Sequence, residues 1–525
     1  RRSDPTLRGR RDLEILSARN CRRGFIDITA SRVYSHSRFA PDHPFESSYM
    51  SALEFGKPRR RFVPGGGILL VVAAVLLVAG GFWMLPRFEW HKPQIKITPD
   101  SDVVGLGALV IEASDRGSGL KTFSASLSSG GVDFPLVSEQ YPEPLMQKNF
   151  TVALSSKLTG LKEGPAVLRI SARDRSLWSF FRGNETALAK NITVDITPPT
   201  LELVADDRYV NFGGVGAIVY KPSADTVNTG VKIGNYFFPG YKGQIKEHPD
   251  YFLAFFAHPY NVAEDQRAAL VAADRAGNTR EMRLVYELKN VKYKKSTIAI
   301  SDEFIAAKVT PLLNDVGARQ GSPKDIFIKV NRDLRKENDE RIRAITMKQT
   351  PSILWKGAFT QLSNSKVEAN FADARTYTYK DAVIDNAYHL GYDLSVTKHY
   401  SAEAANSGVV AFVGDLGIYG NTVIIDHGMG LFTLYSHLSS IDIKAGDQVR
   451  QGQPLGKTGE TGLAAGDHLH FGVYLHGAPI LPVEWWDQKW IRDNVQPKIE
   501  GRSSEAADEA KAPTAAGKAG RKQKR

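Results

Sequence analysis

Cysteine is almost absent from this 525-residue sequence, which contains a single one, Cys21. A lone cysteine forms no internal disulfide and supplies no thiolate cluster for structural zinc, so any metal site must use histidine and carboxylate ligands. The HExxH pattern, in which one helix carries two zinc-binding histidines and a general base, is missing as well. With 42% hydrophobic residues the chain is too apolar for general disorder, and its length predicts several domains.

Excess charge is missing from most of the chain. The formal net charge of +11 is concentrated at the two ends, with +7 in residues 1–61 and +3 in residues 499–525. Residues 62–498 therefore carry only +1. A basic surface across a folded domain would indicate nucleic-acid binding, and because no such surface is expected here, we expect no nucleic-acid partner.

One long apolar run is present. Residues 62–86 contain no charged side chain, and 25 residues suffice for a helix to cross a hydrocarbon core of about 30 Å. Basic residues at 57–61 precede the run, and Trp83 and Trp90 lie at its far end, which predicts a single-pass inner-membrane helix with the rest of the chain outside. The alternative is a cleaved signal peptide with its apolar stretch at 68–79. Both interpretations export the rest of the chain.

The two ends of the chain are expected to lack a packed core. Residues 1–61 are predicted to be a cytoplasmic or disordered segment, and the first methionine is Met50. Because residues 1–49 are arginine-rich and aperiodic, we expect them to be an upstream extension that is not native. Residues 500–525, rich in Ala, Glu, Lys and Gly, are predicted to be a disordered basic tail.

Short alternating apolar and polar runs fill residues 94–292, separated by Gly, Pro, Asn and Asp, which predicts antiparallel β-sheets. SARDRSLW at Ser171 and VAADRAGNT at Val271 each end a strand with Asp-Arg and lie 100 residues apart, about the length of one β-sandwich. Two modules are predicted, over 94–197 and 198–292. They resemble the immunoglobulin-like spacer modules of bacterial surface proteins, which implies that they hold a catalytic domain away from the membrane.

Between residues 293 and 365 the pattern changes to that of helices. The string SDEFIAAKVTPLLNDV opens on the capping residue Ser301, and the segment that follows Ser322 has apolar residues at helical spacing among charges. We expect a helical connector or a cap on the substrate side, without chemistry of its own. Whether it is autoinhibitory stays open.

The histidines are clustered, because seven of the twelve fall within residues 389–476. In YHLGYDLS a spacing of two places His389 and Asp393 on one face of an extended segment, and Gly391 between them leaves room for something to approach. One imidazole and one carboxylate are therefore expected to converge.

Two further strands supply similar groups. In GDHLHFG the same spacing places His468 and His470 together, and in FTLYSHLS it pairs Tyr435 with His437. Two imidazoles and one carboxylate form a ligand set of catalytic zinc, which keeps its fourth position for water. Iron oxygenases use the same ligand types, so iron stays open as the metal, whereas calcium and magnesium prefer oxygen ligands.

At these residues the sequence resembles a known family. The patterns H-x-G-x-D, D-H-G, Y-x-H-L, G-x-x-V-x-x-G-Q, T-G and H-L-H-F occur in this order, and they are those of the lysostaphin-type (LytM-type) zinc endopeptidases, which cut peptide bridges in bacterial cell walls. The resemblance covers residues 366–490. It implies a C-terminal antiparallel β-sheet peptidase domain of the duplicated-hybrid-motif type. In one departure, Gly472 follows H-L-H-F where the family often has Glu.

The resemblance also implies the site. By motif position the zinc ligands, for one Zn²⁺ per active site, fall on His389, Asp393 and His470, and two unligated active-site histidines fall on His437 and His468. With no HExxH glutamate, one of these two imidazoles is expected to take a proton from water while the other stabilises the oxyanion or protonates the leaving amine. The sequence leaves open which does which.

The implied function is hydrolysis of peptidoglycan stem-peptide crosslinks. The family includes enzymes for pentaglycine bridges and for D-Ala to diaminopimelate crosslinks. An exported domain without disulfides, tethered to an inner membrane, favours the periplasm and hence the second substrate. The whole chain is thus predicted to be mainly β, with one membrane helix, two sandwich modules, a helical connector and a zinc peptidase domain.

Other functions stay open. Degenerate relatives that bind cell wall or activate another hydrolase lose zinc ligands, whereas here every motif position is occupied. A structural surface protein would explain the sandwich modules but not the clustered histidines. The string KAGDQVRQGQPLG resembles the hairpin of biotinyl and lipoyl carrier domains, but the M-K-M context is absent. His427 is predicted to fix a turn with Asp426, and His399 and His476 are expected to take no part.

Overall fold

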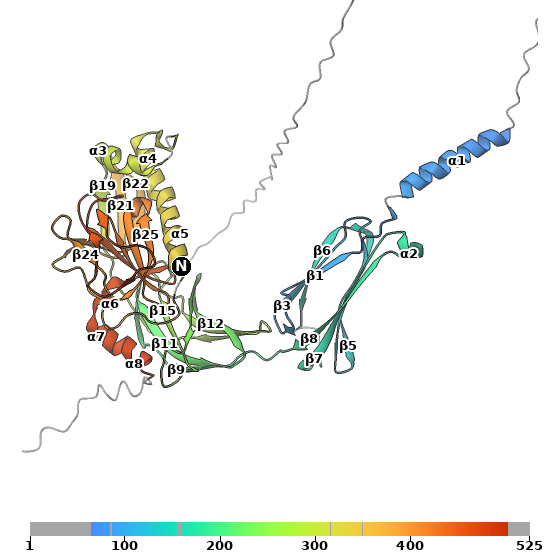
Figure 1. Cartoon of the computed structure of the whole chain (residues 1–525), viewed down its shortest axis with the longest axis horizontal. Helices are drawn as coiled ribbons and strands as arrows, with labels where there is room; N and C mark the ends of the chain where they lie inside the picture. Colours follow the sequence, from blue (N-terminus) through green and yellow to red (C-terminus); the bar gives the residue numbers. More distant parts are fainter. Residues whose placement is uncertain (1–64, 85–86, 155–159, 315–316, 349, 502–525) are drawn as a thin grey trace, which may run out of the picture. The chain divides into compact units, whose positions relative to one another are not determined.

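The structure is a computed structural model of the chain, and it describes residues 65–84, 87–154, 160–314, 317–348 and 350–501 (Figure 1). The predicted segment 1–61 lies outside the described residues, as does nearly all of the predicted tail 500–525. Helix α1 (Gly65–Met84) occupies most of the run at 62–86. Among the described residues no helix is both long and apolar enough to cross a membrane. The predicted membrane span is therefore not confirmed.

The first module consists of two β-sheets, with strand orders β1-β3-β6 and β2-β8-β7-β4-β5. All strand pairs are antiparallel except β2 with β8. The bounds are β1 (Gln94–Thr98), β2 (Val103–Val104), β3 (Ala108–Ser114), β4 (Leu120–Ser129), β5 (Val132–Leu145), β6 (Gln147–Ala153), β7 (Gly164–Asp174), helix α2 (Trp178–Phe181) and β8 (Glu185–Val194).

Alternating burial along these strands gives the first module a core of its own. Every second side chain of β3 is buried, as expected for strands with one face turned inward. Phe123 of β4 stacks on Phe150 of β6 with ring centroids 3.9 Å apart, which joins the two sheets. The apolar cluster around them contains only residues between 95 and 196.

The second module also has two sheets, with orders β14-β15-β11-β9 and β13-β12-β16-β17, and a parallel pair β10-β18. The bounds are β9 (Leu201–Ala205), β10 (Tyr209–Asn211), β11 (Val215–Pro222), β12 (Thr226–Ile233), β13 (Tyr236–Pro239), β14 (Tyr241–Lys242), β15 (Phe252–Ala257), β16 (Ala269–Asp274), β17 (Thr279–Arg283) and β18 (Glu287–Lys289).

The core of the second module continues into the C-terminal domain. One apolar cluster runs from Ala205 to Val495, and in it Phe255 of β15 packs edge-on against Trp485, 6.0 Å between ring centroids. The buried carboxylate of Glu484 accepts hydrogen bonds from Asn211 Nδ2 (2.7 Å) and from the backbone of Val215 (2.8 Å). The module predicted as a spacer is therefore packed directly against the domain that carries the histidines.

The predicted connector at 293–365 forms helices, but it begins with a strand. Strand β19 (Lys295–Ala299) pairs in parallel with β21 (Asp373–Tyr379). The side chains of Ser301 and Ser322 cap the helices that follow. These helices are α3 (Asp302–Phe304), α4 (Pro323–Lys329) and α5 (Arg335–Thr346), with helical turns at Ile305–Val309, Thr310–Leu312, Gly317–Arg319 and Val330–Leu334.

An eight-stranded sheet forms the centre of the C-terminal domain, in the order β20-β23-β31-β27-β26-β25-β29, with β32 beside β31. Smaller sheets are β19-β21-β22 and β24-β30-β28. The bounds are β20 (Lys366–Ala369), β22 (Ala382–His389), β23 (Tyr392–Ser395), β24 (Ser401–Glu403), β25 (Gly408–Asp415), β26 (Asn421–Asp426), β27 (Leu431–Ser436), β28 (Ser440–Ile441), β29 (Gln448–Val449), β30 (Pro454–Lys457), β31 (Leu469–Leu475) and β32 (Ala478–Ile480).

Both faces of this sheet are covered, so β27 and β31 are buried along their whole length. Alternate side chains enter different cores. Leu431 and Tyr435 join the cluster shared with the second module, whereas Phe432 and Leu434 join a cluster with Phe327 and other residues of the helical segment. The last described elements are the short helices α6 (Pro482–Trp486), α7 (Gln488–Trp490) and α8 (Gln496–Ile499), with a helical turn at Ile491–Val495 between the last two. The described chain is thus mainly β, as predicted.

Candidate metal centre

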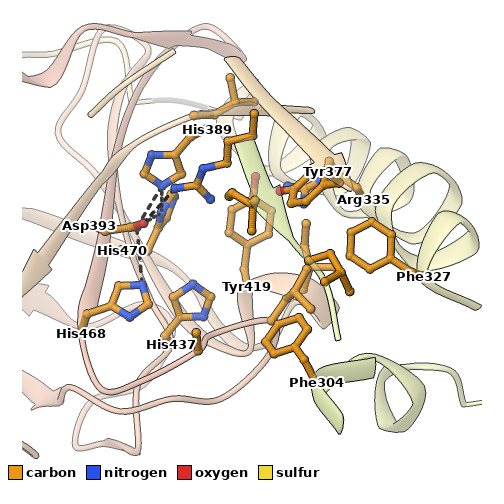
Figure 2. Close-up of a pocket in the computed structure, with 17 residues that line it drawn as sticks. Phe304, Phe327, Arg335, Tyr377, His389, Asp393, Tyr419, His437, His468 and His470 are labelled. Atoms are coloured by element: carbon orange, nitrogen blue, oxygen red, sulfur yellow. Dashed lines mark hydrogen bonds and ion pairs between the residues drawn. The ribbon is translucent and has the colours of Figure 1, made fainter. Parts of the chain in front are cut away.

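Three of the predicted site residues converge on one point, His389, Asp393 and His470. Nε2 of His389 lies 2.9 Å from Oδ1 of Asp393 and 2.9 Å from Nδ1 of His470. The Nδ1 atom of His470 lies 3.0 Å from the same carboxylate oxygen. Figure 2 shows the three side chains pointing toward one another at one end of a pocket.

Three strands bring the three residues together. Asp393 of β23 is the register partner of His470 of β31, and His389 is the last residue of β22. The chain bends at Leu390 and Gly391, so His389 and Asp393 do not share one extended strand as the spacing predicted. A side chain at Gly391 would come within 2.7 Å of Nε2 of His470. The room that this glycine leaves is therefore filled by the partner histidine.

The hydrogen bonds of His389 determine which ring nitrogen faces the cluster. Its Nδ1 lies 2.9 Å from the carbonyl oxygen of Asn370, and because a carbonyl only accepts, Nδ1 carries the proton. Nε2 of the neutral ring then presents a lone pair to a carboxylate oxygen 2.9 Å away. Two such acceptors repel unless a cation lies between them. Ligands of tetrahedral zinc, bound at about 2.0–2.1 Å, are about 3.3 Å apart, so the donor set fits a divalent metal.

Electrostatics keeps Asp393 in its anionic form. Burial by itself would raise the pKa of this carboxyl, but the neighbouring imidazoles of His389, His468 and His470 stabilise its anion and hold the pKa well below its usual value. In addition, Nη2 of Arg375 donates a hydrogen bond to Oδ2 of Asp393, at 3.2 Å. One carboxylate oxygen thus faces the histidines and the other is held by the guanidinium.

His437 and His468 lie beside the cluster, with ring centroids 4.8 Å apart. Nδ1 of His437 donates to the carbonyl of Thr461 and Nδ1 of His468 to that of Gly466, both at 2.8 Å. In each ring Nε2 is therefore left as the acceptor, and Nε2 of His468 lies 3.5 Å from Oδ1 of Asp393. Both rings can accept a proton at Nε2.

The surroundings of these two histidines differ. Burial, reinforced by the charges of His468 and His470, lowers the pKa of His437 well below its usual value. Burial also acts to lower the pKa of His468, but the hydrogen bond and charge of Asp393 outweigh it and raise that pKa. Burial lowers the pKa of His470 to about 4.

Tyr435 does not face the site, so its predicted pairing with His437 is wrong. Strand β27 ends at Ser436, and His437 adopts a left-handed backbone conformation with φ of 63°, which is uncommon for a residue other than glycine. This turn breaks the period of two. Tyr435 is instead buried on the opposite face, where its hydroxyl accepts from the backbone of Ala405 and from Thr433 Oγ1.

Several pocket residues were missed from the sequence. Arg375 and Tyr377 alternate along β21 and line the pocket, and the period of two in DARTYTY was an available signal. The ring of Tyr419 lies 5.5 Å from that of His470. Its hydroxyl donates to Asp339 of α5, at 2.8 Å. No local pattern pointed to Tyr419, because its role depends on packing between distant segments.

The pocket has a volume of about 260 Å³, and its far wall comes from the predicted connector. Figure 2 shows Phe304, Phe327 and Arg335 on the opposite side of the pocket from Asp393. The apolar side chains of Ile298 and Ile300 also line it. The segment that was predicted to be a connector or a cap on the substrate side thus forms one wall of the pocket.

The remaining histidines of this domain lie outside the pocket. His427 is fully buried, with Nδ1 donating to the carbonyl of Ser407 and Nε2 2.7 Å from Thr433 Oγ1. His427 is thus structural, as predicted, but its ring contacts Ser407 and Thr433 and makes no hydrogen bond to Asp426. His399 is exposed and His476 stacks on Tyr241. At Gly472, a Cβ atom would come within 3.0 Å of the Tyr474 side chain. This position therefore has little room for the glutamate that the lysostaphin-type family often has there.

The comparison with protein families identifies this domain. Residues 387–482 match peptidase family M23, so the chain contains an M23 peptidase domain of the LytM or lysostaphin type. The match includes every histidine and carboxylate of the cluster. Arg375 and the far wall of the pocket, at residues 298–335, lie outside it.

Two curated relatives are similar in sequence over this region. The DD-carboxypeptidase/endopeptidase Mpg of Neisseria meningitidis serogroup B is 40% identical over 95 residues, which is 18% of this chain and 22% of that protein. The peptidoglycan DD-endopeptidase ShyA of Vibrio cholerae is 33% identical over 118 residues, 22% of this chain and 27% of that protein. The chain thus spans about a quarter of the length of these relatives. The catalytic domain of lysostaphin from Staphylococcus simulans aligns over 25% of this chain and 98% of that domain, with 24% identity and a TM-score of 0.22.

Proposed function

We propose that the chain is a zinc-dependent endopeptidase that hydrolyses peptide crosslinks of bacterial peptidoglycan. The observation that carries the proposal is the convergence of His389 Nε2, Asp393 Oδ1 and His470 Nδ1 within 3.0 Å of one another. These three residues would hold the ion. When bound, zinc supplies a Lewis acid that polarises the scissile carbonyl and lowers the pKa of water toward 7.

The chain's own residues supply the proton transfers. Hydrolysis adds hydroxide to the carbonyl carbon and a proton to the amide nitrogen, so one group must accept a proton from water and one must deliver it to the leaving amine. His437 and His468 both present an unprotonated Nε2, held in place by the Nδ1 hydrogen bonds to Thr461 and Gly466. One ring takes the proton and the other hydrogen-bonds the developing oxyanion or protonates the amine.

The substrate proposal rests on the peptidase family and on the named activities of the relatives, one of which is called a peptidoglycan DD-endopeptidase. The pocket has an apolar wall opposite the candidate metal centre, which side chains of the substrate could contact. Because peptidoglycan lies outside the cytoplasm, we propose the periplasm as the location of the catalytic domain. The predicted membrane anchor stays a prediction.

Digestion of purified sacculi tests the proposal. The full chain loaded with zinc is expected to release muropeptides whose masses identify the bond cut, a chelator is expected to abolish the release, and added zinc to restore it. A protein that holds stoichiometric zinc but releases nothing from sacculi or from synthetic crosslinked peptides would contradict the proposal. Binding to sacculi without release of muropeptides would instead support the alternative function, that of an inactive protein that binds the cell wall.

A further inference from the structure

A second cavity adjoins the candidate metal centre. Its volume is about 330 Å³, and Arg335 and Leu390 line both cavities, so the two meet at these residues. Arg335 is the first residue of helix α5. Figure 2 shows Arg335 beside Tyr377, across the pocket from Asp393. A peptide bound at the metal centre would therefore lie within reach of a guanidinium supplied by the helical segment.

The second cavity is basic. Its charged lining residues are Arg332, Arg335, Lys336, Arg343, Asp339 and Glu340. Two of the cations already have carboxylate partners, because Arg332 pairs with Asp385 at 3.0 Å and Lys336 approaches Glu340 at 3.9 Å. The carboxylate of Asp339 accepts the hydroxyl of Tyr419. The balance leaves an excess of positive charge beside the metal centre.

A buried network fixes the orientation of Arg335. Its Nε and Nη2 atoms donate to Oδ1 of Asn331, at 3.2 and 2.9 Å. Nδ2 of Asn331 donates to Oδ2 of Asp385, at 2.9 Å, and both of these residues are buried. Nη1 of Arg335 has no acceptor among the described residues. The amide of Asn331 thus holds one edge of the guanidinium and leaves N–H donors available to a ligand.

Such a guanidinium matches one chemical group of the substrate. Arginine N–H groups pair with a carboxylate through two parallel hydrogen bonds, and prior fixation of the side chain reduces the entropy lost on binding. Of the two crosslinks considered above, a pentaglycine bridge has no carboxylate along its length, whereas a diaminopimelate residue keeps a free carboxylate beside the crosslinking amide.

We propose that Arg335 is a specificity-determining residue that binds a free carboxylate of the peptide substrate next to the scissile amide. This inference rests on the proposed function and narrows it to crosslinks that carry such a carboxylate. The catalytic domain thereby takes its chemistry from the strands and its selection of substrate from helix α5.

Two synthetic crosslinked peptides test this proposal on the zinc-loaded full chain. Both contain the D-Ala to diaminopimelate crosslink, and they differ only in that the free carboxylate of diaminopimelate is a carboxamide in the second. The wild type is expected to cleave the carboxylate peptide with a kcat/KM about 10- to 100-fold higher, the range for a charged hydrogen-bond pair. In Arg335→Gln the two peptides are expected to be cleaved equally.

Two further variants separate recognition from stability. Arg335→Lys keeps the charge but loses the planar fork, so it is expected to retain only part of the preference. Arg341→Gln removes an equal charge from the same helix, at a residue that lines neither cavity and donates to the carbonyl of Asp415, and it is expected to keep the full preference. A loss of folding alone would lower both rates together and leave their ratio unchanged.

The outcomes separate this inference from the proposed function. Equal cleavage of both peptides by the wild type, or an unchanged preference in folded Arg335→Gln and Arg335→Lys, overturns the role of Arg335. If the wild type cleaves neither peptide, the proposed function fails, and calorimetric affinities for the same two peptides then decide. Tighter binding of the carboxylate peptide that is lost in Arg335→Gln supports the subsite, and equal affinities overturn it.

Discussion

The two walls of the pocket are built differently. One wall, from the strands within residues 387–482, holds the histidines and Asp393 so that their nitrogen and oxygen atoms lie as close as 2.9 Å. The other wall, from β19 and the helical segment, is largely apolar and carries one oriented arginine. Under the proposed function, chemistry and substrate selection come from separate parts of the chain. The reacting groups would lie in the domain that matches the peptidase family, and the surface that meets the substrate would lie before it.

The largest effect is expected from the first wall. His470→Ala removes one of the three proposed ligands, so metal content and peptidase activity should be lost together. The loss of metal affinity should exceed the about 10- to 100-fold loss expected when a residue that only orients a ligand is replaced. Metal analysis and digestion of sacculi measure both. His399→Ala, at an exposed histidine outside the pocket, is the control and should change neither. A His470→Ala protein that keeps full zinc content and full activity would contradict the role of His470 as a metal ligand.

A smaller effect is expected where a histidine moves protons but holds no metal. His437→Ala should keep near-stoichiometric zinc while hydrolysis falls by about 10²- to 10⁴-fold, the range for a removed acid or base. Zinc content and peptide turnover are measured on the same sample. Full activity in this variant would show that His437 has no part in proton transfer, and loss of zinc would show that it is a ligand.

Arg375 tests whether the division between the walls is strict. It lies on β21, before the matched domain, yet it donates to Oδ2 of Asp393. Arg375→Gln should weaken zinc binding by about 10- to 100-fold, because the ligand carboxylate loses the group that orients it. Competition with a chromogenic chelator measures the affinity. An unchanged zinc affinity would show that Arg375 does not support zinc binding and that residues 387–482 are sufficient for it.

The smallest effect is expected on the stability of the fold, at the hydrogen bond between Tyr419 and Asp339 that joins the two walls. Burial raises the pKa of Asp339 above its ordinary value, although the hydrogen bond from Tyr419 and the charge of Arg335 oppose this. The folded state then retains a proton that the unfolded state has lost, so stability falls as pH rises from the unfolded pKa, about 4, through the raised folded pKa. Asp339→Asn keeps an acceptor for Tyr419 and lacks this ionisation.

Denaturant unfolding of both proteins between pH 4 and pH 8 measures the difference. The wild type is expected to lose stability relative to Asp339→Asn with rising pH and to be no more stable at the upper end. A wild type that gains stability over the same range, relative to the variant, would mean that Asp339 is stabilised as an anion.

The sequence predicted one wall well and the other poorly. The five motif residues of the centre lie within short local patterns, and the resemblance to a known family predicted that these patterns share one site. Arg335 and Tyr419 reach the pocket through packing of the helical segment on the sheet, and no local period encodes that contact. Tyr435 was placed on the wrong face because alternation cannot detect the left-handed backbone at His437.

The prediction of the folds of the modules shows the same limit. Alternating apolar and polar residues predicted the sheets of the first module, which has its own core. In the second module, FLAFFA of β15 is almost wholly buried, and such a continuous apolar run indicates a strand covered on both faces. That signal was present in the sequence, but it does not say which segment covers the outer face. The partner proved to be the C-terminal domain.

The shared interior has a practical consequence for anyone who dissects this protein. A fragment trimmed to the peptidase motifs would leave Trp485 without Phe255, and Glu484 without the amide groups that satisfy it. Such a fragment would expose a hydrophobic surface that the second module normally covers, and it would be prone to aggregate. The smallest fragment worth expressing therefore starts near residue 198, and replacing the second module with that of a homologue would disturb the core of the peptidase domain.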